Sequence, residues 1–290
     1  MTAPEPATTP ADTSANTSAN TSANPSANTH AASTGARVTV LPRRLARVPE
    51  LTVLFWVLKI LTTGMGETAS DYLAHTIGPV LAVGLSGIAL AAALTVQLRL
   101  RRYAPWAYWT AVAMVSVFGT VAADVAHVGL GVPYIASTIG FAVVLAVVLV
   151  VWHRSEGTLS VHSIDTTRRE LFYWATVLTT FALGTAAGDL TAVVLGLGYL
   201  GSAVLFAVAF AVPAVAHLRL GLGPVVAFWT AYVITRPLGA SVADWMGVSH
   251  ARGGLALGTG AITLAWAAAI AAIVGYTVVS GRARAATVDA

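Results

Sequence analysis

Eight long apolar segments follow one another along the chain from Leu51. We place them at about 51–73, 79–98, 105–128, 133–152, 171–195, 199–218, 224–247 and 254–280. Each is close to the roughly 20 residues that an α-helix needs to cross the hydrocarbon of a bilayer. Tight turns containing glycine or proline join the first segment of each pair to the second, so the pattern predicts four helical hairpins.

Polar positions recur at fixed places inside the first segment of each hairpin. An aromatic residue and a tryptophan open the segment, a glycine follows ten residues after the tryptophan, and an aspartate follows five residues later. These positions are Trp56, Trp109, Trp174 and Trp229, then Gly66, Gly119, Gly184 and Gly239, then Asp71, Asp124, Asp189 and Asp244. The recurrence predicts four repeats at about 51–100, 105–153, 170–219 and 224–280, all with the same orientation because each contains two spans.

Composition and charge indicate a membrane protein. Hydrophobic residues make up 57% of the chain and charged residues only 10%, and the mean hydropathy is +0.76. The arginines fall before the first span, between the hairpins and after the last span, which places both termini in the cytoplasm. We therefore expect an all-α integral membrane protein with eight transmembrane helices in four parallel repeats, surrounded by the lipid bilayer of the bacterial cytoplasmic membrane.

The remaining composition narrows the partners and the ends of the chain. The net charge of +4 follows membrane topology, so we expect no nucleic-acid partner, and a homo-oligomer stays open. The lack of cysteine excludes thiolate metal sites. Residues 1–36 are a low-complexity segment that we expect to be disordered. Residues 37–50 form a basic juxtamembrane segment, residues 51–280 the membrane domain, and residues 281–290 a basic cytoplasmic tail.

The aspartates carry the functional signal, because a charged side chain at the centre of a membrane helix costs ~2.5 to 3.5 kcal/mol even on the lower scales. Glu67 lies one helical turn before Asp71 and adds a fifth carboxylate. We interpret the four tryptophans as anchors at the headgroup level. Fifteen helical residues then place every aspartate ~22 Å along its span. We expect the four aspartates to lie at one depth, in the outer half of the membrane, and to bind cations or protons together with Glu67.

Two cations and two histidines lie near these carboxylates. We expect Lys59 to neutralise the pair of Glu67 and Asp71, and Arg236 to neutralise Asp244. His75 and His127 follow Asp71 and Asp124 by four and three residues, which brings an imidazole and a carboxylate to one helix face. Carboxylate with imidazole suits manganese, zinc, iron or nickel. The alternative is that these histidines only titrate at the membrane surface.

The glycine before each aspartate predicts a break in the helix. Broken spans expose backbone carbonyls to ions in transporters. The same break would also let each aspartate cap a second short helix, which is a structural role. We expect a cation transporter for a divalent metal, with proton-coupled export of a manganese-type ion as the specific form, and no tightly bound cofactor other than that cation. The alternative is a structural or regulatory membrane protein. A shared cavity would favour transport, and four separate capped turns would favour structure.

Enzyme chemistry has little support in the sequence. The chain has no zinc-protease helix motif, no glycine-rich phosphate loop and no nucleophile elbow. Four equivalent aspartates are also more than the two that an aspartyl protease requires. We therefore expect no catalytic activity.

The four tryptophans in their repeated setting, together with the run Gly-Glu-Thr-Ala-Ser-Asp at 66–71, resemble a known pattern. Over about residues 50–280 the chain is similar to a bacterial family of uncharacterised membrane proteins, built from four tandem two-span repeats that each carry a characteristic tryptophan. The resemblance implies the repeat architecture and transfers no activity.

Overall fold

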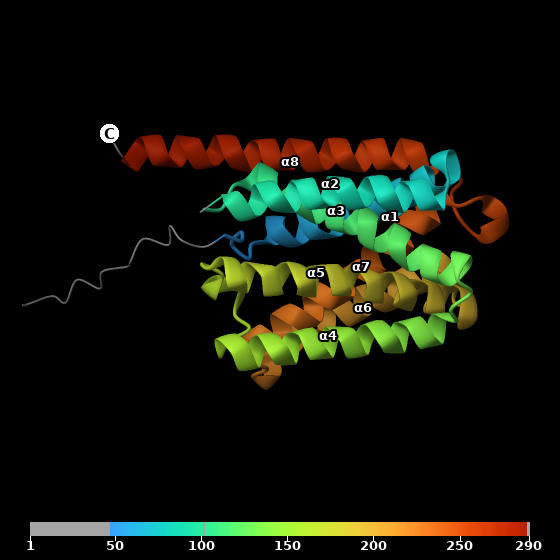
Figure 1. Ribbon diagram of the computed structural model, residues 1–290, viewed down its shortest axis with the longest axis horizontal. Helices are drawn as coiled ribbons and strands as arrows, with labels where there is room; N and C mark the ends of the chain where they lie inside the picture. Colours follow the sequence, from blue (N-terminus) through green and yellow to red (C-terminus); the bar gives the residue numbers. More distant parts are fainter. Residues whose placement is uncertain (1–46, 101, 289–290) are drawn as a thin grey trace, which may run out of the picture. The chain divides into compact units, whose positions relative to one another are not determined.

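The computed structural model describes residues 47–100 and 102–288 (Figure 1). The low-complexity segment predicted at 1–36 and most of the basic segment at 37–50 lie outside these residues. The described part of the chain is all α-helical and contains no β-strand. Its long helices are α1 (Val53–Ile77), α2 (Pro79–Arg99), α3 (Pro105–Asp124), α4 (Tyr134–Glu156), α5 (Thr167–Asp189), α6 (Gly198–Leu220), α7 (Pro224–Gly247) and α8 (Thr259–Val288).

Four short segments complete the order of elements. The π-helices η1 (Val125–Gly129) and η3 (Leu190–Val194) continue directly from α3 and α5. The 3-10 helices η2 (Val161–Ser163) and η4 (His250–Arg252) lie in the connections before α5 and α8. The last helix, α8, reaches Val288 and so extends through most of the segment predicted as a tail at 281–290.

Helix ends follow local sequence signals. Thr52 and Thr166 accept backbone hydrogen bonds at the first turns of α1 and α5. Proline opens α2, α3 and α7, where the missing N–H has no helical partner to lose. Gly157 and Gly221 end α4 and α6 in the left-handed conformation that glycine adopts without strain.

Seven of these helices are long and apolar enough to cross a membrane. The exception is α1, which has 25 residues but carries Lys59, Glu67 and Asp71 along its length. In α2, α4, α6 and α8 only 17% of the most apolar stretch is buried within the protein, against 39 to 67% in α3, α5 and α7. The even-numbered helices therefore present most of their apolar surface outward, as expected for helices that face lipid.

The odd-numbered helices form an inner ring. Each packs against the next one, α1 on α3, α3 on α5, α5 on α7, and α7 returns to α1. The even-numbered helices pack outside this ring, and Figure 1 shows the helices lying lengthwise beside one another. Within this arrangement α2 covers α3, α4 covers α5, α6 covers α7 and α8 covers α1. The packing unit is thus an even helix with the next odd helix, shifted by one helix from the sequence repeat.

The helix breaks predicted at the four glycines are wrong. Each inner helix runs unbroken through its glycine, and α7 also continues through Pro237. Each glycine instead leaves room for the next inner helix, since an added Cβ would collide with it. The colliding residues are Ser116 at Gly66, Phe181 at Gly119, Arg236 and Pro237 at Gly184, and Thr63 at Gly239. An unbroken helix keeps its backbone hydrogen-bonded, and the glycine brings the neighbouring helix close.

We expect Gly184→Ala to destabilise the fold by about 1 to 3 kcal/mol, the usual cost of overpacking. Its new methyl group would collide with the Cβ and Cγ atoms of Arg236. Gly140 in α4 is the matched control, because a Cβ there meets no atom of the described residues within 4 Å. Alanine at position 140 should be neutral or slightly stabilising. Thermal unfolding in detergent measures both variants, and equal midpoints would contradict the close approach at Gly184.

The four aromatic pairs form a second ring at one end of the inner helices. Trp109, Trp174 and Trp229 are only 3 to 6% exposed, so the prediction that they anchor the spans at the membrane surface is wrong for these three, and Trp56 is half-buried. The aromatic residue of each repeat contacts the tryptophan of the next repeat. The ring-centroid distances are 5.8 Å for Phe55 and Trp109, 5.6 Å for Tyr108 and Trp174, 6.2 Å for Tyr173 and Trp229, and 5.7 Å for Phe228 and Trp56. We call this set the aromatic layer. The tryptophans are buried because the outer helices cover the inner ring.

Candidate cation site

All four aspartates and Glu67 line a single cavity of about 490 Å³. It lies among the ends of the inner helices that are 15 residues beyond the tryptophans, away from the aromatic layer. His75, Tyr134, Tyr199 and Arg252 also line it. The structure therefore brings together the four aspartates that the repeat spacing places at one depth and Glu67, which lies one helical turn earlier on α1. We call this space the carboxylate cavity.

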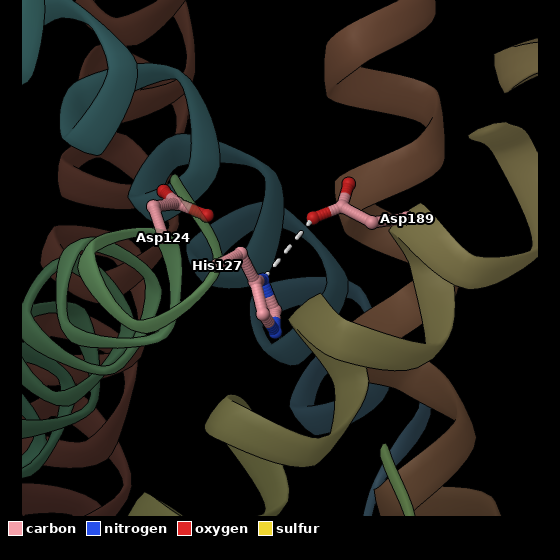
Figure 2. A group of neighbouring side chains, drawn as sticks. All are labelled: Asp124, His127 and Asp189. Atoms are coloured by element: carbon pink, nitrogen blue, oxygen red, sulfur yellow. Dashed lines mark ion pairs between the residues drawn. The ribbon is translucent and has the colours of Figure 1, made fainter. Parts of the chain in front are cut away.

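Asp124, His127 and Asp189 are the tightest group of potential metal ligands in the described part of the chain (Figure 2). Each offers one ligand atom, and these atoms lie within 4.8 Å of one another. The Nδ1 atom of His127 is 3.9 Å from Oδ2 of Asp189. Ser70 of α1 donates a hydrogen bond of 3.4 Å to Oδ2 of Asp124. Two carboxylates and an imidazole at this separation form a ligand set suited to a divalent transition metal.

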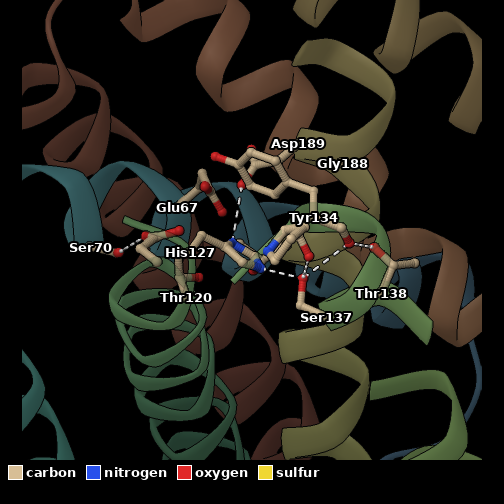
Figure 3. Close-up of polar contacts among 12 residues, drawn as sticks. Glu67, Ser70, Thr120, His127, Tyr134, Ser137, Thr138, Gly188 and Asp189 are labelled. Atoms are coloured by element: carbon tan, nitrogen blue, oxygen red, sulfur yellow. Dashed lines mark hydrogen bonds and ion pairs between the residues drawn. The ribbon is translucent and has the colours of Figure 1, made fainter. Parts of the chain in front are cut away.

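Hydrogen bonding orients His127 toward this group (Figure 3). Ser137 of α4 donates its hydroxyl hydrogen to the backbone oxygens of Tyr134 and Pro133, at 3.0 and 3.3 Å. Its oxygen therefore accepts from Nε2 of His127, 2.6 Å away. This network assigns the hydrogen of the neutral imidazole to Nε2 and leaves a lone pair on Nδ1. Nδ1 is buried, and it has no hydrogen-bond partner among the described residues.

We expect Ser137→Ala to weaken divalent metal binding by about 10-fold, at the lower end of the effect of removing a group that orients a ligand histidine. The variant keeps all three ligands but frees the imidazole to rotate or change tautomer. Isothermal titration of the purified protein with Mn²⁺ measures the change. Ser202→Ala is the control: Ser202 accepts a comparable hydrogen bond from Thr191 in the third repeat, and neither residue belongs to the ligand group. Equal affinities in wild type and Ser137→Ala would show that this hydrogen bond does not orient a ligand.

The aspartates do not cap broken helices. Asp124 and Asp189 are the last residues of α3 and α5, directly before η1 and η3, and neither side chain makes a capping hydrogen bond. Asp71 and Asp244 lie inside the continuous helices α1 and α7. Irregular backbone thus follows only Asp124 and Asp189, as π-helix, a conformation often found at functional sites. The structural alternative required each aspartate to cap a second short helix after a break at the preceding glycine, and none of the four aspartates has this geometry.

Arg236 lies at the centre of the inner ring beside the cavity. One of its nitrogens, Nη2, donates to Oε2 of Glu67 at 2.5 Å and to the hydroxyl of Thr185 at 2.7 Å, and it also donates to the hydroxyl of Thr120. A single nitrogen of α7 therefore joins α1, α3 and α5. The predicted pairing of Arg236 with Asp244 is wrong, because the side chain crosses the ring axis toward its neighbours instead of following its own helix.

Lys59 makes no ion pair with Glu67 or Asp71, so its predicted pairing is also wrong. Its Nζ atom is completely buried and has no hydrogen-bond partner in the described part of the chain. It lies 4.2 Å from the ring centroid of Phe181 and 4.4 Å from that of Tyr232. Glu67, which is two turns along the same helix, is already bound by Arg236.

The two histidines have different places. His75 lines the cavity but is exposed, and its Nδ1 lies 2.7 Å from the backbone oxygen of Asp71. It is outside the group formed by Asp124, His127 and Asp189. Hydroxyl residues such as Thr120 and Thr185 could be expected near the carboxylates from the sequence, whereas the contacts of Ser70 with Asp124 and of Ser137 with His127 could not. Small and hydroxyl residues at these places are also explained by helix packing, so their position alone gives no sign of a site.

A second buried ion pair lies outside the cavity. Arg47 donates from Nη1 to Oε2 of Glu170 at 2.7 Å, and Gln97 donates from Nε2 to Oε1 of the same carboxylate at 2.9 Å. Trp174 donates from Nε1 to Oε1 as well, at 3.4 Å. These contacts fix the segment before α1 to α2 and α5 at the end of the ring that carries the aromatic layer.

A family model described as Repeat of Unknown Function (DUF347) matches the chain four times, at residues 54–103, 107–158, 172–221 and 227–283. Each match begins within two residues of an aromatic pair and covers one predicted hairpin. The chain has no significant match among curated proteins or among solved structures. The four matches confirm the tandem repeats.

Proposed function

Because the chain belongs to the DUF347 repeat family, whose description carries no activity, we propose from the carboxylate cavity that it transports a divalent cation across a membrane. The observation that carries this proposal is the convergence of four repeated aspartates on one cavity. In the proposed arrangement all eight helices span the bilayer, the four repeats are parallel, and both termini are cytoplasmic.

The charge balance supports a cation as the substrate. Five carboxylates line the cavity, and Arg236 pairs with only one of them. Arg252 adds one positive group among its lining residues. Carboxylates close together inside a membrane are stable only with protons or bound cations. An empty carboxylate cavity therefore favours the uptake of either, which is the property that a proton-exchanging cation transporter needs.

The ligand set supports a transition metal over calcium or magnesium. The unprotonated Nδ1 of His127 lies beside Asp124 and Asp189, and hard cations such as Mg²⁺ and Ca²⁺ prefer oxygen alone. Mn²⁺ accepts carboxylate and imidazole together and is our first candidate, with Zn²⁺ and Fe²⁺ next. Asp71 and Asp244, which line the same cavity, would receive the ion.

The basic residues support an outward-facing cavity. Arg99, Arg154, Arg169 and Arg219 lie at or near helix ends on the side of the aromatic layer, which the positive-inside rule assigns to the cytoplasm. The cavity then opens away from the cytoplasm, and Arg236, Lys59 and the aromatic layer separate it from the cytoplasmic end. Export would require a second conformation that opens this inner half.

The test is metal flux in vesicles that contain the purified protein, measured for Mn²⁺, Zn²⁺, Fe²⁺, Mg²⁺ and Ca²⁺ with and without a pH gradient. We expect a transition metal to cross the membrane while protons move in the opposite direction, which the internal pH reports. Protein-free vesicles should show neither movement. Folded protein that moves none of the five ions would contradict the proposal and favour a structural or regulatory role.

A further inference from the structure

Lys59 is the only lysine of the chain and has no role in the cavity as described so far. It lies on α1, eight residues before Glu67, which is ~12 Å along a helix. It therefore lies between the carboxylate cavity and the aromatic layer. Its side chain is completely buried, and Nζ has no hydrogen-bond partner among the described residues. A buried amine with no acceptor is costly and needs an explanation.

The groups around Lys59 hold an ammonium only weakly. Phe181 of α5 and Tyr232 of α7 present ring faces to Nζ at 4.2 and 4.4 Å, and such contacts stabilise a cation modestly. Arg236 of α7 contacts the same Phe181 ring, with its guanidinium carbon 5.4 Å from the ring centroid, and its positive charge repels a second cation. Beyond Tyr232 lie the hydroxyls of Tyr173 and Tyr108, which are bonded to each other. The other helices packed on α1 add no titratable side chain over residues 79–98 of α2 and 259–275 of α8.

We propose that Lys59 is the group that exchanges a proton when the carboxylate cavity gains or loses its divalent cation. The inference rests on the proposed function. When the cavity holds no metal, the negative charge of its carboxylates retains the proton on Nζ. When a divalent cation enters, one N–H bond of the ammonium breaks, the electron pair stays on nitrogen and the proton leaves to water. When the cation departs, the amine takes a proton back.

Charge and chemistry both select Lys59 for this exchange. A divalent cation at the cavity cancels the carboxylate charge, and in a low-dielectric interior this change acts over distances of ~12 Å. Arg236 cannot respond, because a guanidinium stays protonated in proteins and this one is fixed to three helices. A buried lysine exchanges its proton readily. Lys59 makes no hydrogen bond with the proposed ligands Asp124, His127 and Asp189. Its proton therefore responds to the net charge of the cavity.

The single lysine permits a direct measurement. Protein labelled with ¹⁵N at the lysine side chain gives one Nζ resonance, whose chemical shift distinguishes ammonium from amine. We use Zn²⁺, which is diamagnetic, at neutral pH in detergent, and measure zinc binding by titration of the same sample. The expected result is an ammonium signal without zinc and an amine signal at saturating zinc. The double variant Asp124→Asn, Asp189→Asn is the matched control, because it removes both the metal site and two of the carboxylate charges. Its Lys59 signal should already be that of the amine without zinc and should not change when zinc is added.

Two results would overturn the proposal in different ways. If wild type binds zinc and the Lys59 signal is the same with and without it, the proton exchange is wrong and the cation site stands. If wild type binds no zinc, Mn²⁺ or Fe²⁺, the proposed function fails and this inference fails with it.

Vesicle flux gives a further check: Lys59→Met and Lys59→Arg should both bind metal but lose the opposing proton movement. Full proton movement in Lys59→Arg would show that only a fixed positive charge is needed there.

Discussion

Asp124→Asn or Asp189→Asn should each lower divalent metal affinity by more than about 100-fold and abolish transport. Loss of a group that only orients a ligand lowers metal affinity by about 10 to 100-fold. These variants should have a larger effect, because they remove the charge of a ligand itself. Asparagine keeps the size and hydrogen bonding of the side chain, so the protein should still fold. The double variant should lose little more than either single one, as expected for groups that act as a unit. Titration with Mn²⁺ and vesicle flux measure the two effects.

Asp165→Asn is the matched control for these variants. Asp165 forms an exposed ion pair with Arg169 outside the cavity, and its loss should leave metal affinity and transport unchanged. Normal transport by the folded Asp124→Asn, Asp189→Asn double variant would mean that the two carboxylates do not share one cation site. A structural role for the repeated aspartates would then explain them better.

Arg236→Gln should lower the free energy of unfolding by about 3 to 5 kcal/mol, the usual cost of removing one partner of a buried ion pair. The variant leaves Glu67, which is 5% exposed, without its cation, and it removes the bonds to Thr120 and Thr185. Lys59→Met should be neutral or stabilising, because Nζ has no partner to lose and its burial is costly. Chemical or thermal unfolding in detergent compares the two.

A double variant separates the ion pair from the hydroxyl contacts of Arg236. Glu67→Gln removes the charge that Arg236→Gln would leave bare, so the combination should be more stable than the sum of the two single losses predicts. Additive losses of unfolding free energy would show that Arg236 and Glu67 do not form the ion pair. A Lys59→Met variant as unstable as Arg236→Gln would show that Arg236 is not the cation that holds the inner ring together.

The constant spacing from tryptophan to aspartate was enough to predict that the four carboxylates share one depth. Fifteen helical residues after each tryptophan place Asp71, Asp124, Asp189 and Asp244 at one level whatever the rotation of each helix, and the structure adds that all four line one cavity. The eight helices could be predicted from the apolar segments of the sequence, although only seven of the helices are apolar enough to cross a membrane and α1 carries three charged residues.

Contacts between helices could not be predicted in this way. Lys59 lies eight residues before Glu67, and Arg236 lies eight residues before Asp244. This spacing suggested that each cation neutralises an acid on its own helix, but Arg236 reaches across the ring to Glu67. Glycine before an aspartate is compatible with a helix break and with close helix packing, and only the position of Ser116, Phe181, Pro237 and Thr63 decides for packing. The pairing of each even helix with the next repeat's odd helix is likewise a tertiary property.

The site geometry near His127 depended on a local feature that the sequence does not show. The π-helix after Asp124 gives the backbone a wider turn than an α-helix, and His127 lies within that segment, beside Asp189 of the next inner helix. The equivalent π-helix after Asp189 has Ala192 at the position of His127. Thr191, one residue earlier, donates a hydrogen bond to Ser202, which lies 13 residues after Asp189 as Ser137 lies 13 residues after Asp124. The second and third repeats thus share this π-helix, and only the second carries an imidazole in it.

The central claim is that a divalent cation binds between Asp124, His127 and Asp189, and pulsed electron paramagnetic resonance of bound Mn²⁺ tests it most directly. This method detects a nitrogen ligand by its hyperfine coupling to the metal. We predict one bound Mn²⁺ with a nitrogen coupling in wild type, and loss of that coupling in His127→Gln while His75→Gln retains it. Folded protein that binds no Mn²⁺, or that binds it with the same spectrum in wild type and His127→Gln, would contradict the account.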